Sequence, residues 1–362
     1  MKEFKKIGVL TSGGDAPGMN CAIRAITRKA LERNVEVVGI VGGYSGLIND
    51  KIIPMTSASV SNIVTRGGTM LYSDRCLEFQ TEEGMAKAIA TCKKHGIDAI
   101  VAIGGDGTFR GATDLTLHGI PTIGVSGTID NDITATDYTV GFDTAMNTTM
   151  EAIDKFRDSC ESHARVNIIE VMGRGCGQIA LQTAVASGAI AVAIPEVPFD
   201  EAAAIERIRK ARENGKRGMI VVVSEGCFVK DETGNEIPYS EVLTAKLKSE
   251  LKLDAKFARL AHLVRGGNPT LRDRVSASHM GVMAVELLLE GKSNLIIAEY
   301  DGELVSMDIL FALTTDRMYK NKLKDGDLEK FNAEQIAQME AICEKRRREI
   351  AELYKVANEI AV

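Results

Sequence analysis

The chain has 362 residues, a length that suits two domains better than one. Hydrophobic residues make up 45% and charged residues 26% of it, which is ordinary for a globular protein. The net charge of −6 argues against a nucleic-acid partner, which a strongly basic domain would signal, and the most apolar stretch, 184–194, is too short to cross a bilayer.

Seven cysteines are scattered along the chain, odd in number and without a CxxC pair. This pattern argues against a disulfide framework and a zinc site of the usual spacing. It indicates reduced thiols. The N-terminus reaches an apolar strand-like run at once, without the features of a signal peptide. We therefore expect a cytoplasmic protein.

Short apolar runs alternate with helix-like segments. The predicted strands are 7–10, 35–41, 99–103, 121–125, 166–171, 189–194, 219–224 and 257–263, and the predicted helices include 19–33, 82–94, 144–158 and 272–290. This alternation predicts βαβ units, and therefore an α/β fold with doubly wound parallel sheets. The last segment, 334–362, has helical apolar spacing with one polar gap. We interpret its basic run, 345–348, as a solvent-exposed face.

Two glycine-rich loops follow predicted strands. In the loop 11–20, glycines allow backbone N–H groups at the start of a helix to approach a phosphate closely. The loop 104–108, Gly-Gly-Asp-Gly-Thr, lacks the lysine of a P-loop, and its glycine spacing does not fit a dinucleotide fingerprint. A nicotinamide dehydrogenase is therefore the weakest alternative. Asp106, between two glycines, is suited to Mg²⁺, although each loop would also serve as an ordinary turn.

A third cluster, 127–132, reads Gly-Thr-Ile-Asp-Asn-Asp and follows another strand. One of its carboxylates could accept a hydroxyl proton while the other orients a metal or an arginine. Ligands of doubly wound sheets gather at the carboxyl ends of strands, so three such clusters in series indicate phosphoryl transfer. A second half-site is expected where other strands end, at 172–174, Glu225 and 262–267.

These motifs together resemble the phosphofructokinase family, in its short bacterial ATP-dependent type, from about residue 5 to 308. The motifs that support the resemblance are 11–20, 66–69, 104–107, 127–132, 172–174 and 265–267. The resemblance implies Mg-ATP-dependent phosphorylation of the 1-hydroxyl of fructose 6-phosphate to fructose 1,6-bisphosphate, in glycolysis, by a homotetramer.

The resemblance also implies an architecture of two Rossmann-like domains with the active site in the cleft between them. The ATP-binding domain would contain 1–140 and about 256–305, and the sugar-phosphate domain 141–255 and about 306–330. Residues 331–362 would form a C-terminal helical extension beyond the short family members.

Roles of individual residues follow from the same resemblance. The residues expected to line the ATP site are Gly13, Arg75, Cys76, Gly105, Asp106, Gly107 and Thr108, with Asp106 holding Mg²⁺. Asp130 would be the general base, Asp132 would support it, Thr128 would hydrogen-bond the transferring phosphoryl group, and Arg75 and Arg174 would stabilise its charge. The residues expected to bind the sugar phosphate are Thr128, Ile129, Asp130, Arg165, Met172, Gly173, Arg174, Glu225, Lys256, His262 and Arg265, and Arg165 would reach across a subunit contact.

Two positions with small residues indicate whether ATP or pyrophosphate is the phosphoryl donor. Pyrophosphate-using relatives typically have Asp where this chain has Gly107 and Lys where it has Gly127. An aspartate at 107 would crowd and repel the α-phosphate of ATP, so the glycine favours ATP.

The chain departs from the family at three places. Lys256 stands where an arginine is usual, which makes another ketose phosphate an alternative acceptor, because lysine does not bind phosphate bidentately. Arg24, Arg28 and Lys216 match effector-site residues, but Ser57 replaces an arginine and Ile190 a metal-binding glutamate. We therefore expect weak or no activation by ADP. The third departure is the C-terminal extension.

A further alternative, from another class, is a non-catalytic regulatory paralogue. The chain keeps the complete charged set on which the implied chemistry depends, namely Asp106, Asp130, Asp132, Arg75 and Arg174. A silent copy would not need all five, and the set therefore favours an enzyme.

Overall fold

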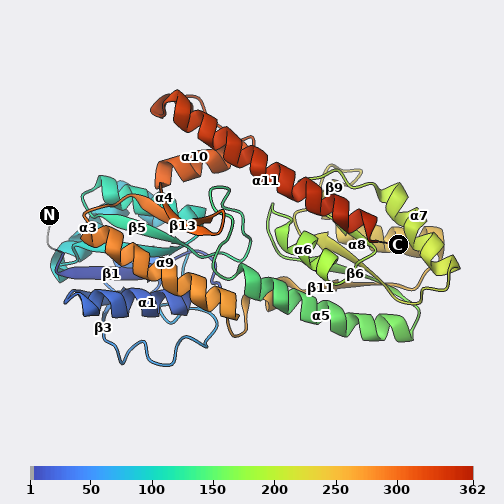
Figure 1. Cartoon of the computed structure of the whole chain (residues 1–362), viewed down its shortest axis with the longest axis horizontal. Coiled ribbons are helices and arrows are strands. Elements are labelled where there is room, and N and C mark those ends of the chain that lie inside the picture. Colours follow the sequence, from blue (N-terminus) through green and yellow to red (C-terminus); the bar gives the residue numbers. More distant parts are fainter. Residues whose placement is uncertain (1–3, 362) are drawn as a thin grey trace. The chain divides into compact units, whose positions relative to one another are not determined.

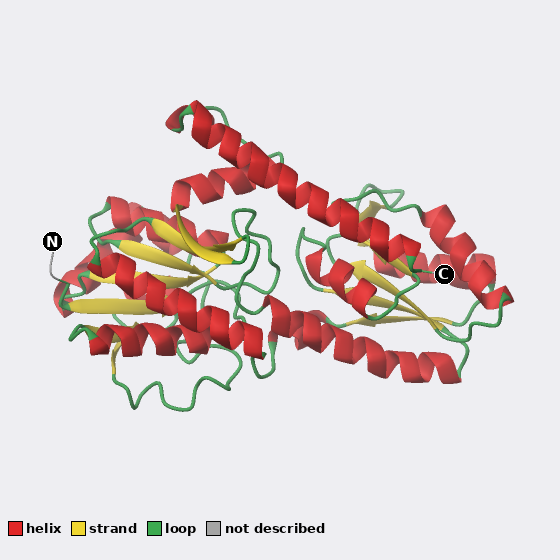
Figure 2. Cartoon of the chain, in the orientation of Figure 1, coloured by secondary structure: helices red, strands yellow, loops and turns green. Residues whose placement is uncertain are grey.

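The computed structural model describes residues 4–361, which fall into two compact units. The first unit contains the chain up to Ile129, with Ile133–Thr144 and Arg265–Cys343, and the second contains Asp130–Asp132, Ala145–Val264 and the residues from Glu344 onward. Each unit is a sheet with helices packed against it (Figures 1 and 2). The predicted α/β class is confirmed.

The first unit is built on a seven-stranded sheet. Its strands, in spatial order, are β13 (Glu303–Asp308), β12 (Leu295–Tyr300), β5 (Thr122–Ser126), β4 (Ala99–Gly104), β1 (Lys6–Thr11), β2 (Glu36–Ile40) and β3 (Ile52–Met55). The two edge strands, β13 and β3, run antiparallel to their neighbours, and the five inner strands are parallel. The central strand β4 is buried along its whole length, as expected for a parallel strand covered on both faces.

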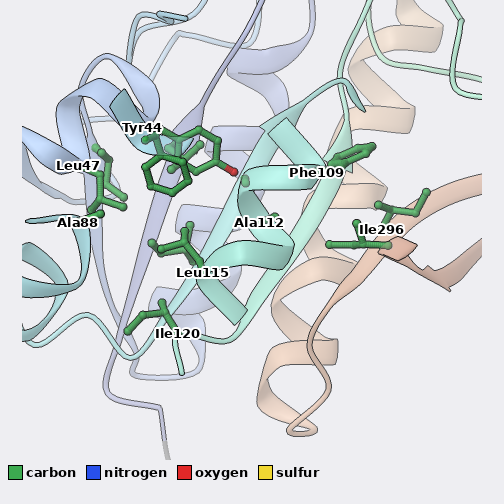
Figure 3. Packing of buried hydrophobic residues seen from close by; sticks show 14 of the residues in the cluster. Tyr44, Leu47, Ala88, Phe109, Ala112, Leu115, Ile120 and Ile296 are labelled. Atoms are coloured by element: carbon green, nitrogen blue, oxygen red, sulfur yellow. The ribbon is translucent and has the colours of Figure 1, made fainter. Parts of the chain in front are cut away.

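Helices cover both faces of this sheet. On one face, α1 (Met19–Glu32) and α9 (Leu271–Leu289) lie side by side (Figure 1). Gly281 of α9 permits this close approach, because a Cβ there would lie 2.9 Å from the carbonyl oxygen of Ala22. The helices of the other face are α2 (Gly43–Ile48), α3 (Glu82–His95), α4 (Asp106–Leu117) and α10 (Ile309–Tyr319). Their apolar side chains, among them Tyr44 and Phe109, form the core in Figure 3.

The second unit has a smaller, fully parallel sheet. Its strands, in spatial order, are β11 (Ala255–Arg259), β6 (Val166–Val171), β8 (Met219–Ser224) and β7 (Ala191–Ala193). The helices α6 (Gln178–Ala186), α7 (Glu201–Glu213) and α8 (Tyr239–Leu251) belong to this unit, as does a hairpin of β9 (Phe228–Lys230) and β10 (Glu236–Pro238). Two longer helices, α5 (Phe142–Ser162) and α11 (Ala333–Glu359), contribute residues to both units.

Residues 4–361 also contain three short 3₁₀ helices: η1 (Glu78–Gln80), η2 (Ala261–Arg265) and η3 (Leu328–Lys330). The predicted strand 257–263 is wrong in its second half. Strand β11 ends at Arg259, and Ala261 has a positive φ of 43°, which turns the chain out of the sheet into η2.

The compact units divide the chain differently from the expected domains. Residues 306–330 lie in the first unit, because β13 pairs with β12 and α10 packs on α4. Residues 256–264 lie in the second unit, because β11 pairs with β6. Within residues 4–361, no helix is both long enough and apolar enough for a bilayer crossing.

Candidate active site

Three loops of the first unit meet at one edge of its sheet. They follow β1, β4 and β5, which are neighbours in the sheet and parallel, so their carboxyl ends share an edge. The Thr108 hydroxyl donates to the carbonyl oxygen of Ser12 at 3.1 Å. The backbone N–H of Gly127 donates to the carbonyl oxygen of Gly104 at 2.9 Å. The structure therefore brings the three predicted phosphate-handling loops together.

Glycine is required at two positions of these loops. Gly13 has a φ of +82°, a conformation that other residues rarely adopt. A Cβ at Gly104 would lie 2.2 Å from the Thr108 hydroxyl oxygen. These glycines keep the loops close together, with their backbone N–H groups at the edge where a phosphate would bind.

The two donor-selecting positions differ in the space around them. A Cβ at Gly107 would meet no atom within 4 Å, whereas one at Gly127 would lie 3.1 Å from the side chain of Ile103. Residue 107 therefore faces open space, as the prediction of an ATP site requires. A lysine at 127 would need its neighbours to shift.

Asp106 is the first residue of α4, and its carboxylate pairs with Arg110 one helical turn later, at 2.7 Å. Carboxylate oxygens suit Mg²⁺, which commonly takes one or two of them together with substrate phosphates. Among residues 4–361, no group of three or more His, Cys, Asp and Glu side chains could hold a metal ion. Asp106 would therefore supply one carboxylate to a magnesium ion, and the nucleotide and water would have to supply the other ligands.

The remaining ATP-site candidates lie on the loop before η1. Arg75 is exposed, and the carbonyl oxygen of its neighbour Asp74 accepts from the N–H of Gly13 at 3.5 Å. Cys76 is half-buried and packs against the core of Figure 3. The loop therefore adjoins the first glycine loop, and the Arg75 side chain extends into solvent.

Arg265, predicted to bind the sugar phosphate, lies in the first unit. Its guanidinium Nη1 donates to the carbonyl oxygen of Asp15 at 3.1 Å. Gly14 makes room for it, since a Cβ there would lie 2.8 Å from that nitrogen. His262 lies on η2 in the second unit and is exposed.

The central feature of the second unit is a buried carboxylate beside an arginine. Asp130 is 2% exposed, and its Oδ2 lies 3.7 Å from Nε of Arg174. A buried carboxylate requires compensating charge, which the guanidinium supplies. Thr128 and Ile129, the other candidates of this loop, immediately precede Asp130 in the chain. They belong to the first unit, whose first segment ends at Ile129.

Glu225 holds the turn that carries Arg174. Its Oε1 accepts from the backbone N–H groups of Gly173 and Arg174 at 3.1 and 2.8 Å. Arg174 has a positive φ of 53°, unusual for a residue with a side chain, and these two hydrogen bonds stabilise it. Met172, Gly173, Arg174 and Glu225 thus form one cluster with Asp130, at the ends of the adjacent strands β6 and β8.

Arg165 and Lys256 do not join this cluster. Arg165 immediately precedes β6, and Lys256 pairs with Asn167, the second residue of β6. Met172 follows the other end of β6. At about 3.3 Å per residue, Arg165 and Lys256 therefore lie roughly 20 Å from Met172. Both pair with Asp254, at 2.5 and 2.8 Å. Hydrogen bonds from Lys256 and then Arg165 lower the pKa of Asp254 to about 2.

One residue of this region was missed by the sequence analysis. Arg346 of α11, in the basic run predicted to be a solvent-exposed face, is buried, whereas Arg347 and Arg348 are exposed. Its Nη2 donates to the backbone carbonyl of Asn131. The signal was present in the helical period: 346 follows Cys343 by three residues and precedes Ile350 by four, so it fills the polar gap of the apolar stripe.

The possible effector residues are distributed over both units. Arg24 and Arg28 lie one turn apart on α1, and Lys216 follows α7 in the second unit. Ile190, which replaces the metal-binding glutamate, is buried in the core of the second unit, and its carbonyl oxygen accepts from Arg207 at 2.9 Å. This position therefore offers no metal ligand from its side chain.

Comparisons with known proteins show which proteins the chain is similar to. The family model described as phosphofructokinase matches residues 6–288. The ATP-dependent 6-phosphofructokinase of Bacillus pumilus is 50% identical over 307 residues, covering 85% of this chain and 93% of that protein. ATP-dependent 6-phosphofructokinase 1 of Clostridium perfringens is 48% identical over 320 residues, covering 88% of this chain and 97% of that protein.

A solved structure extends the similarity to the whole chain. The T-state phosphofructokinase of Pichia pastoris matches with a TM-score of 0.84 and 30% identity, covering 100% of this chain and 40% of that one. The family match spans most of the chain, and the relatives are about 50% identical to it over aligned regions that cover nearly their full length. The chain belongs to the phosphofructokinase family.

Proposed function

We propose that the chain transfers the γ-phosphoryl group of ATP to the 1-hydroxyl of fructose 6-phosphate, giving fructose 1,6-bisphosphate and ADP in glycolysis. The observation that supports this best is the buried Asp130 beside Arg174, directly after the loop of Thr128. A carboxylate for proton transfer and a guanidinium for phosphoryl charge are the side chains that this reaction needs.

The first unit would bind the nucleotide. The loops of Gly13 and Gly105–Thr108 would present backbone N–H groups and the N-terminus of α4 to its phosphates. The open space at Gly107 favours ATP as donor. Asp106 would hold Mg²⁺, which when bound neutralises phosphate charge.

The second unit would bind and activate the sugar phosphate. Asp130 would take the proton of the 1-hydroxyl as its oxygen forms a bond to the γ-phosphorus, while the bond from that phosphorus to the bridging oxygen breaks and its electron pair leaves with ADP. Asp132 would support the base, and Thr128 would hydrogen-bond the transferring group. Arg174, with Arg75, would stabilise the negative charge on the phosphoryl oxygens, where electrostatic stabilisation is most effective.

Arg165 and Lys256 would serve the sugar site of a second copy. They lie together at the end of β6 away from Arg174, so they cannot reach the substrate held by their own Asp130 cluster. Two adjacent cations around one carboxylate, Asp254, suit a phosphate group that would displace part of that pairing. This division of the site implies a homo-oligomer, with a homotetramer in the cytoplasm as the family expectation.

The alternative acceptor remains a different ketose phosphate, and Lys256 is the observation that favours it. A lysine binds phosphate as a point charge and discriminates less by geometry than an arginine does. The remaining contacts of the cluster do not depend on Lys256, so the reaction type is the same for both acceptors.

The test is identification of product and donor. The protein is incubated with fructose 6-phosphate and either Mg-ATP or magnesium pyrophosphate, and ³¹P NMR follows the products. We expect a second phosphate ester at carbon 1 with ATP alone. Turnover with pyrophosphate instead would overturn the donor, and turnover only with another ketose phosphate would overturn the acceptor.

A further inference from the structure

The C-terminal helix α11 lies beyond the residues matched by the family model, which end at 288. Its second half, from Glu344, belongs to the second unit. Arg346, Ile350 and Ala357 are buried at spacings of four and seven residues, which places them on one face of the helix. Near the end of the helix, the Asn358 side chain accepts from Arg207 of α7 at 3.1 Å. This part of α11 is therefore docked on the second unit.

Arg346 is the charged residue on that buried face. Its guanidinium donates to the backbone carbonyl of Asn131, which lies between Asp130 and Asp132. Burying a guanidinium is costly unless it is hydrogen-bonded and its charge is compensated. The position of this residue is consequently specific rather than incidental.

The surroundings of Arg346 supply the compensation. Burial raises the pKa of Glu196, and the guanidinium of Arg346 opposes that rise. Glu196 in turn accepts from the backbone N–H of Gly177 at 2.8 Å. Cys176 adds a weak contact, with its Sγ 4.0 Å from the Asn131 carbonyl oxygen. Arg346 is thus hydrogen-bonded to the loop of Asp130, with the Glu196 carboxylate as a negative charge nearby.

Asn131 is the point at which this support matters most. It is buried and has a positive φ of 48°, a conformation that costs free energy for a residue with a side chain. A donor fixed on its carbonyl oxygen restrains the peptide plane that follows it. That restraint acts directly on the peptide between Asn131 and Asp132, one residue after Asp130.

We infer that Arg346 is a positioning residue for phosphoryl transfer: through the carbonyl of Asn131, the C-terminal helix fixes the loop that carries Asp130. The inference rests on the proposed role of Asp130 as general base. It makes α11 a part of the catalytic apparatus, although no residue of the helix touches the reacting groups in this account. Misplacing a catalytic group by about 1 Å can cost about 100-fold in rate.

The experiment compares Arg346→Met and Arg346→Lys with Arg348→Met, which removes the same charge from an exposed position on the same helix. For Arg346→Met we expect kcat to fall by about 10- to 100-fold, with a cooperative thermal transition and a KM for Mg-ATP within about twofold of the parent. Arg346→Lys keeps a cationic donor and should recover part of kcat. Arg348→Met should match the parent.

A double-mutant cycle tests the route of the effect. In single-turnover measurements, Arg346→Met should add little to the loss already caused by Asp130→Asn, because both act on the same proton transfer. Fully multiplicative losses, or a kcat for Arg346→Met equal to that of Arg348→Met, would overturn the inference. If Arg346→Met does not fold, Arg346→Lys replaces it in the cycle: a loss of kcat in that variant that multiplies fully with the loss in Asp130→Asn contradicts positioning.

The same experiment separates the inference from the proposed function. Parental activity in Asp130→Asn alone would mean that Asp130 is not the base, and the proposed function would fail first. A large loss in Asp130→Asn with none in Arg346→Met would leave the base in place and remove only the role of Arg346.

Discussion

The candidate sites of the two units are built in different ways. In the first, the candidate site is made mainly of backbone: glycines that bring three loops together, a helix N-terminus and open space at residue 107. In the second, it is made of charged side chains on a restrained backbone, with Arg174 and Asn131 both at positive φ. Changes in the first unit should therefore alter nucleotide affinity, and changes in the second should alter the rate of chemistry.

After substitution of Asp130 itself, the largest effect is expected for Arg174→Met. Removing the guanidinium takes away the charge beside Asp130 and the expected stabilisation of the phosphoryl oxygens. We expect kcat to fall by about 10²- to 10³-fold, with little change in the KM for Mg-ATP. Steady-state kinetics with both substrates varied would measure this. A change in the KM for either substrate without a change in kcat would contradict the expectation that the second unit controls the rate of chemistry.

Asp273→Ala tests whether a buried carboxylate of the first unit stabilises the fold, in contrast to the catalytic role proposed for the buried Asp130 of the second unit. Asp273 accepts hydrogen bonds from the Gly141 N–H at 2.6 Å, the Thr144 N–H at 2.8 Å, and the hydroxyls of Thr144 and Tyr138. Its loss leaves several buried donors unpaired, and we expect a decrease of about 2–4 kcal/mol in the free energy of unfolding. Urea denaturation measures this free energy. The control is Glu290→Ala, which changes an exposed residue at the C-terminal end of the same helix.

Gly107→Asp should raise the KM for Mg-ATP by about 10- to 100-fold through like-charge repulsion of the phosphates. The protein should still fold normally, because a Cβ at 107 meets nothing within 4 Å. Gly107→Ala, which adds the Cβ without the charge, is the matched control and should change KM only slightly. Equal effects of the two substitutions would indicate crowding rather than charge.

Lys256→Arg should have the smallest effect. A guanidinium can bind phosphate bidentately, so we expect the KM for fructose 6-phosphate to decrease by about two- to fivefold without a change in kcat. Initial rates at saturating ATP would show it. An unchanged KM in this variant and in Lys256→Gln would mean that residue 256 does not contact the acceptor.

The first unit's site was predictable from the sequence because its determinants are local. A strand, a glycine turn and a helix start occur within about ten residues, and parallel pairing then brings the loops to one edge. The cluster of Arg174, Glu225 and Asp130 was predictable in composition, since each residue follows a strand. The separation of Lys256 from that cluster was not predicted, because it depends on which end of β6 the residue pairs with. For Arg165, the family resemblance implied a contact across subunits.

Arg346 shows the limit of a local interpretation. In sequence it is one of four consecutive basic residues, and such runs usually face solvent. In the fold it is buried and donates to the carbonyl of Asn131, 215 residues away in the chain, whereas Arg347 and Arg348 are exposed. The helical period marks residue 346 as inward-facing, and attention to that period would have separated it from Arg347 and Arg348.

The central claim is that Asp130 is the general base of a kinase whose nucleotide site is built separately. The most direct test is the steady-state kinetics of Asp130→Asn, a substitution of nearly equal shape, with Mg-ATP and fructose 6-phosphate. We predict that kcat falls by about 10²- to 10⁴-fold, while the KM for Mg-ATP stays within about twofold of the parent. A kcat close to that of the parent would contradict the assignment of the base, and with it the division of roles between the two units.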